Sequence, residues 1–149
     1  MKKAIIGTVA GLLITMSTAK ASDVNYQEVY NAEGSTSEIV EKISKTTVSM
    51  KPINDSVLKG KAQVRCLISK KKFLLPAVYS TYEGDMLIEA KDNRFRVTYS
   101  NMVYVPDSEM DEAMRGLSLS SASRVNCDDA FNELTLDIWS RSKSYNNNW

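Results

Sequence analysis

The sequence predicts an α+β domain in which two helices pack on one face of a single antiparallel sheet. Residues 57–68 alternate between apolar and polar side chains, which is typical of a strand with one buried face. Residues 86–90 and 95–105 flank the turn-forming tetrad at 91–94, so they predict a hairpin. Two segments with helical spacing of apolar residues lie outside these strands, and their apolar stripes need a sheet face to cover.

The first part of the domain is predicted to be a short strand followed by a helix. Residues 24–30 are rich in valine and tyrosine, and Gly34 ends this strand. Ser35 and Glu38 form a capping-box pattern, in which the two residues satisfy the first free amides of a helix. Apolar residues then follow at nearly helical spacing, which predicts about three turns before Pro52: Ile39, Val40, Ile43 and Val48.

The remaining elements follow the long alternating strand. Three lysines at 70–72 and Pro76 mark a connection, after which residues 78–82 form a brief strand before the hairpin. Within residues 106–125 a helical turn can form at 109–115, and 117–123 is a serine-rich loop. Cap residues at 126–129 and an apolar stripe of Phe131, Leu134, Ile138 and Trp139 predict a closing helix. The expected order is strand, helix, three or four strands, helix, within one domain at 22–145 and a polar tail at 146–149.

The N-terminus carries the pattern of a bacterial signal peptide. Lys2 and Lys3 precede an apolar run at 4–16, and Ala19-Lys20-Ala21 places small residues at the positions that signal peptidase requires. The run is short for a membrane span, which needs about 20 apolar residues. No cysteine follows it, so no lipid anchor is expected. We expect cleavage after residue 21 and a periplasmic or secreted product, the alternative being an uncleaved anchor or a buried helix.

Charge and composition exclude several classes of function. The formal charge is +1, and removal of residues 1–21, which carry three lysines and no acid, changes it to −2. This balance argues against a nucleic-acid-binding protein, which shows a strong basic excess. The chain has no histidine, so histidine-based catalysis and most zinc sites are excluded. We expect no cofactor, no metal and no stable membrane insertion after cleavage.

Three stretches of the chain carry a resemblance to a known family: "SEIVEKISK", "VLKGKAQV" and the hairpin "LIEAKDNRFRVTYSNM". Through them the chain resembles a family of uncharacterised bacterial exported domains with a fold like that of the TATA-box-binding protein (TBP-like). The hairpin is the most specific of these, because it contains Arg94-Phe95-Arg96 after a turn, as family members tend to do. The resemblance implies the fold but no reaction, no catalytic residues and no DNA binding.

Cys66 and Cys127 are candidates for a disulfide. Cys66 is in phase with the apolar residues of its strand, and Cys127 begins the apolar stripe of the last helix, so both face the same core. An exported protein folds in an oxidising compartment, where such a pair forms a bridge. The alternative is two buried reduced cysteines. A redox-active pair is not expected, because the Cys-x-x-Cys spacing is absent.

Five basic residues are candidates for binding a partner. On strands with period two they all fall on the sheet face away from the helices: Lys59, Lys61, Arg65, Arg94 and Arg96. Such a surface suits an acidic protein, a phosphate-bearing lipid or a polysaccharide, although a solvated outer face explains the same pattern. The apolar residues 73–75 beside the lysine triplet either border this surface or fill an edge of the core.

The acidic run at 107–112 is the other candidate region. It resembles the start of a calcium loop, but Ala113 replaces the turn glycine and Ser118 replaces the final glutamate. Acids at a helix N-terminus explain it better. From these patterns we expect a non-catalytic exported domain that binds an unknown protein or envelope component through the outer sheet face or the 106–125 loop, for example as an inhibitor or immunity-type protein. The alternative is a small periplasmic hydrolase that uses carboxylates such as Asp107 or Glu109.

Overall fold

The computed structural model describes residues 24–46, 49–121 and 126–147. The predicted signal peptide, residues 1–21, lies outside this part of the chain. The described residues form one five-stranded antiparallel sheet with the spatial order β2-β6-β5-β4-β3. The strands are β2 (Val24–Asn31), β3 (Met50–Pro52), β4 (Val57–Ser69), β5 (Val78–Lys91) and β6 (Arg94–Val105).

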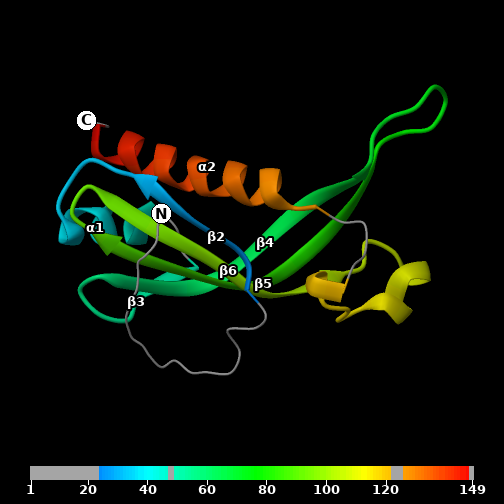
Figure 1. Cartoon of the computed structure of the whole chain (residues 1–149), viewed down its shortest axis with the longest axis horizontal. Helices are drawn as coiled ribbons and strands as arrows, with labels where there is room; N and C mark the ends of the chain where they lie inside the picture. Colours follow the sequence, from blue (N-terminus) through cyan, green and yellow to red (C-terminus); the bar gives the residue numbers. More distant parts are fainter. Residues whose placement is uncertain (1–23, 47–48, 122–125, 148–149) are drawn as a thin grey trace.

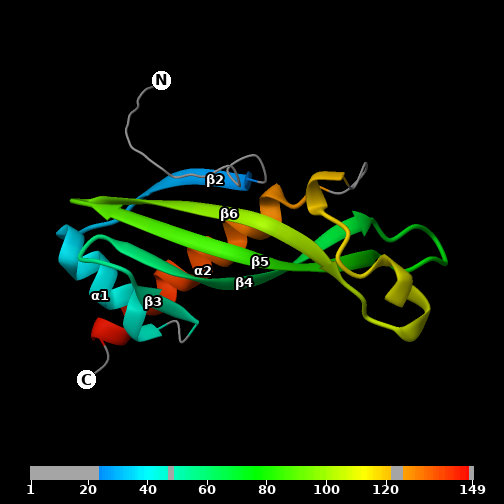
Figure 2. The ribbon, with the colours of Figure 1, turned by 90° about the horizontal axis from the view of Figure 1, so that it is seen from below.

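Two α-helices cover one face of this sheet, as the sequence predicts. They are α1 (Thr36–Thr46) and α2 (Asp128–Asn147), and they pack against each other as well as against the strands. Figure 1 shows α2 lying along the sheet, and Figure 2 views the opposite side, with the sheet in front of α2. Two short 3-10 helices follow β6: η2 (Glu109–Met114) and η3 (Leu119–Ser121). The predicted α+β architecture is therefore confirmed.

The order of elements differs from the prediction at two points. The first helix ends at Thr46, and Pro52 does not stop a helix but closes β3, an edge strand paired with β4. Proline suits this place because an edge strand can lack one backbone donor. The two short strands predicted at 78–82 and 86–90 form one continuous strand, β5, because Gly84 pairs with Ala62 without interrupting the ladder.

Helix α1 has the predicted capping box. The Ser35 amide donates to Glu38 Oε1 (2.9 Å), and the Glu38 amide donates to Ser35 Oγ (3.3 Å). The hydrogen bonds from Ser35 hold the pKa of Glu38 below its usual value. The buried residues Ile39, Val40 and Ile43 form the face that packs on the core.

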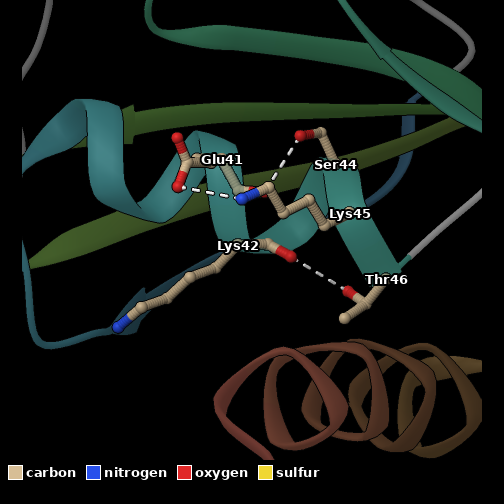
Figure 3. Close-up of polar contacts among 5 residues, drawn as sticks. All are labelled: Glu41, Lys42, Ser44, Lys45 and Thr46. Carbon is tan, nitrogen blue, oxygen red and sulfur yellow. Dashed lines mark hydrogen bonds and ion pairs between the residues drawn. The ribbon is translucent and has the colours of Figure 1, made fainter. Parts of the chain in front are cut away.

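The solvent side of α1 is occupied by contacts within the helix itself (Figure 3). Lys45 Nζ lies 3.3 Å from Glu41 Oε1, and the Ser44 hydroxyl donates to the Glu41 carbonyl (3.0 Å). The Thr46 hydroxyl donates to the Lys42 carbonyl (3.1 Å) and helps to end the helix. These are the local pairs of a solvated helix face.

Aromatic residues make the centre of the core. Tyr99 is fully buried and stacks on Phe131 of α2, with ring centroids 4.6 Å apart. The Thr135 hydroxyl donates to the Phe131 carbonyl (2.8 Å), so the Tyr99 hydroxyl is the donor in its own 2.8 Å bond to Thr135 Oγ1. Burial raises the pKa of Tyr99, because the core disfavours a phenolate. The hydroxyl pair therefore joins β6 to α2 without leaving an unsatisfied polar group.

An extra residue in β6 changes which side chains face the core. Glu83 pairs with Val103 and Asp85 with Ser100, so two residues of β6, Asn101 and Met102, lie opposite the single residue Gly84 of β5. Asn101 takes the left-handed conformation there (φ 56°). Before this bulge the odd-numbered residues of β6 are buried, and after it the buried residues are Met102 and Tyr104. The bulge needs a glycine opposite, because a Cβ at Gly84 lies only 2.7 Å from the carbonyl oxygens of Ser100 and Asn101.

The predicted disulfide is present. Cys66 on β4 bonds to Cys127, which directly precedes α2, and their Cα atoms are 5.1 Å apart. Both residues are buried. The bridge therefore fixes the start of α2 against β4.

Among the described residues, no helix is long and apolar enough to cross a membrane.

Candidate functional site

The sheet face opposite the helices carries all five basic residues that the sequence singled out. Their neighbours on β4 and β6 with the opposite phase are buried beneath the helices, so period two places the basic side chains outward. None of the described helices packs on this face, which we call the outer face (Figure 2). Lys59, Lys61 and Arg65 lie on β4, and Arg94 and Arg96 lie on β6.

The basic residues do not form one continuous stripe, because β5 runs between their two strands. The outward residues of β5 include three carboxylates, Glu83, Asp85 and Glu89. The register sets Asp85 opposite Lys61 and Glu89 opposite Arg96. The expected positive surface is corrected to one of alternating charge, since a sequence pattern gives the face of a residue but not its cross-strand neighbour.

Lys61 and Asp85 form a hydrogen-bonded ion pair. Lys61 Nζ lies 2.6 Å from Asp85 Oδ1, and Asn101 Nδ2 donates to Asp85 Oδ2 (2.9 Å). Partial burial raises the pKa of Asp85, but the hydrogen bonds from Lys61 and Asn101 outweigh it and hold the pKa below its ordinary value of 3.8. The carboxylate also ties β4 to the bulge of β6.

Arg96 is paired with Glu89. Its Nε and Nη2 atoms donate to Glu89 Oε1 at 3.1 and 2.9 Å. This contact and the Lys61 pair lie near the surface, so each contributes little to stability, but each neutralises a cation of the outer face. Two of the five candidates are thus already compensated.

The other three candidates form no ion pair with the described residues, although Lys59 lies near enough to Asp85 to help lower its pKa. Within the described residues, no ion pair involves Lys59, Arg65 or Arg94, and all three are exposed. The Arg65 guanidinium lies over the ring of Tyr79, 4.3 Å from its centroid. Lys51 of β3 pairs with Lys59 and adds a fourth cation at this edge of the sheet.

The sequence missed Lys51 and Tyr79 as members of the outer face. The sequence predicts a helix that Pro52 ends, and the strand β3 has only three residues, too few to show a period, so Lys51 is not expected on the sheet. Tyr79 lies in the stretch 78–82, for which the sequence predicts only brief pairing and no face. The signal that could have found Tyr79 is the alternation of β5, in which Tyr82, Met86 and Ile88 are buried. Extended back along the strand, this alternation places Tyr79 on the outer face.

A hollow of about 230 Å³ lies at the other side of the molecule, where the start of β2 meets α2. Asn25, Ser120, Asn126, Cys127 and Phe131 are among its lining residues. Asn25 Oδ1 accepts from the Met102 amide (3.0 Å), and its Nδ2 donates to Ser120 Oγ (3.1 Å). Asn126 Oδ1 accepts from the amide of Asp128 (2.9 Å). These polar groups support the bulge and the helix start, so the hollow is explained by the fold.

The acidic run of the sequence lies mainly on η2. Glu112 pairs with Arg115, with Arg115 Nε 2.7 Å from Glu112 Oε1, and the hydrogen bond from Arg115 holds the pKa of Glu112 below its usual range. Asp107 and Glu109, the candidates for carboxylate chemistry, are exposed. In the described part of the chain, no three acidic or cysteine side chains gather as a metal site.

Comparison with known proteins finds similarity to solved structures only. No family model matches the sequence, and no curated protein matches it. The structure is similar to that of a TBP-like protein from Parabacteroides distasonis, at 17% identity and a TM-score of 0.46, over 79% of this chain and 91% of that one. It is also similar to a DUF4468 family protein from Bacteroides ovatus, at 10% identity and a TM-score of 0.39, over 77% and 78% of the two chains. A TBP-like protein is thus among its structural neighbours, as the sequence resemblance implies.

Proposed function

We propose that this chain is an exported, non-catalytic binding protein that captures an acidic protein or envelope component on the outer face of its sheet. An inhibitor or immunity-type protein is one concrete form of this role. The observation that carries the proposal is the set of cations without ion pairs, Lys59, Arg65 and Arg94, on a face that the described helices leave open. Such charges attract and orient an oppositely charged partner.

Two further observations support export. The apolar run and the small residues at 19–21 have the pattern of a cleaved signal peptide. The Cys66–Cys127 bridge is buried in the core, and structural disulfides of this kind form in oxidising compartments. The periplasm or the extracellular space is therefore the proposed location.

Charge reversal on the outer face tests the proposal. The variant K59E/R65E/R94E leaves the Lys61–Asp85 and Arg96–Glu89 pairs in place, so we expect its melting temperature to stay within about 3 °C of the wild type, because surface substitutions change stability little. In affinity capture from periplasmic extract, quantified by mass spectrometry, we expect the dominant captured component to decrease at least ten-fold.

A matched control separates the outer face from net charge. Three exposed cations elsewhere can be reversed with the same change of charge, in the variant K45E/R115E/R141E. We expect this control to capture as the wild type does. Equal capture by the wild type and both variants would contradict the proposal. A loss of the protein's cellular phenotype in D107N or E109Q, with the amount of folded protein unchanged, would favour the hydrolase instead.

A further inference from the structure

The hairpin that joins β4 to β5 ends in three exposed apolar side chains. Phe73 is 94% exposed, Leu74 82% and Leu75 67%. They do not fill an edge of the core, which was one of the two places that the sequence suggested. In both views the hairpin projects beyond the rest of the sheet, at the end away from α1 (Figures 1 and 2). The apolar residues therefore sit on a protruding tip.

The tip is a defined turn. The Lys72 amide donates to the Leu75 carbonyl (3.0 Å), and the Leu75 amide donates to the Lys72 carbonyl (2.5 Å). These two reciprocal hydrogen bonds leave Phe73 and Leu74 as the two central residues of the hairpin loop. Phe73 has φ 35°, a conformation for which glycine, asparagine or aspartate is the usual choice. A bulky aromatic residue in this place neither favours the turn nor is covered by the fold.

The tip is also strongly basic. Lys70, Lys71 and Lys72 directly precede the apolar residues and are exposed. No Asp or Glu occurs between Arg65 and Glu83 in the sequence. The central strand of the outer face differs, because its carboxylates pair with neighbouring cations, as Asp85 does with Lys61.

We propose that the β4–β5 tip, residues 70–75, is a peripheral membrane contact that inserts Phe73 and Leu74 into the interface of a bilayer rich in anionic lipid. The apolar pair lies at the apex and the lysines lie one step behind it. This order matches a bilayer, in which the acyl boundary lies below the phosphate layer. Lysine ammonium groups on flexible stems can reach phosphates while their methylenes remain in apolar surroundings.

A protein pocket is the competing occupant, and the charge pattern argues against it. A pocket selects one arrangement of polar groups, whereas three consecutive lysines present cations in several directions and suit a diffuse layer of phosphates. The contact is reversible and spans nothing, so it agrees with the expectation of no stable insertion. It stands apart from the proposed function because it uses none of the outer-face cations.

Vesicle binding of the full chain tests this inference. In co-sedimentation with vesicles of phosphatidylglycerol and phosphatidylcholine in equal parts, we expect binding that weakens as salt rises and is at least ten-fold tighter than binding to phosphatidylcholine alone. The variant F73N/L74G supplies residues that favour this turn, so the hairpin remains folded while the apolar apex is lost. We expect it to bind at least ten-fold more weakly. The variant K70E/K71E/K72E should lose the preference for anionic vesicles.

Two controls make the result specific. Residues 1–21 are treated identically in the wild type and in every variant, so a difference between them reports the tip alone. The outer-face variant K59E/R65E/R94E should bind vesicles as the wild type does, which separates this inference from the proposed function. The chain already contains Trp139 and Trp149, so the readout is a difference: brominated acyl chains should quench the fluorescence of F73W more than that of the wild type if the apex enters the bilayer.

Equal vesicle binding by F73N/L74G and the wild type would overturn the inference. So would an absence of vesicle binding together with capture of a protein that depends on Phe73, since the tip would then be a protein-docking element.

Discussion

Breaking the Cys66–Cys127 bridge is the sharpest test of how this fold is held together. The bridge connects β4 to the start of α2 across 61 residues of sequence. In the reduced protein the two thiols still fill the same core positions, so packing changes little. The main loss is the constraint that the cross-link places on the unfolded chain.

The expected magnitude follows from the length of the closed loop. For 61 residues the chain-entropy relation gives about 4 kcal/mol at 25 °C. A domain of this size has a total free energy of unfolding of about 5–15 kcal/mol, so the bridge is a large part of it. At about 4 °C per kcal/mol, the melting temperature of the reduced protein should fall by about 15 °C.

Urea unfolding with and without dithiothreitol measures the effect. We expect the midpoint to shift to lower urea in reductant for the wild type. The variant C66A/C127A should unfold near the reduced wild type and show no response to dithiothreitol. If oxidised and reduced wild type differ by less than about 1 kcal/mol, the cross-link does not constrain the unfolded chain as reasoned here.

Three other substitutions test the core, the bulge and the outer-face ion pair. Tyr99→Phe removes a buried hydrogen bond to Thr135 and should cost about 1 kcal/mol in urea unfolding; an unchanged midpoint would contradict this role. Gly84→Ala places a methyl group against the bulge at Asn101 and should cost about 2–3 kcal/mol, whereas a stable variant would show that the bulge can move. The depressed pKa of Asp85 adds stability above the unfolded pKa that is lost as pH falls through the folded value, so Asp85→Asn should flatten the decline in stability below about pH 4, and an unchanged acid limb would refute this.

The sequence by itself determined the features that depend on short-range patterns. The capping box at Ser35 and Glu38 was predictable because its two residues are three apart and bond to each other's amides. The alternation of β4 placed Cys66 inward, and the helical stripe placed Cys127 inward, so their meeting required only one shared core. The same reasoning placed all five candidate cations on the outer face.

Only the tertiary structure decided what lies beside those cations. Whether Lys61 meets a carboxylate depends on the register between β4 and β5, and that register is set by packing and turn geometry rather than by the residue itself. The bulge at Asn101 reverses the phase of β6 within a single residue, and it depends on Gly84 of another strand and on the Asn25 side chain of a third. Contacts of this kind join residues far apart in the chain, so no local pattern encodes them. The sequence therefore determines which face of the sheet each residue lies on, and the tertiary structure determines which residues lie beside it.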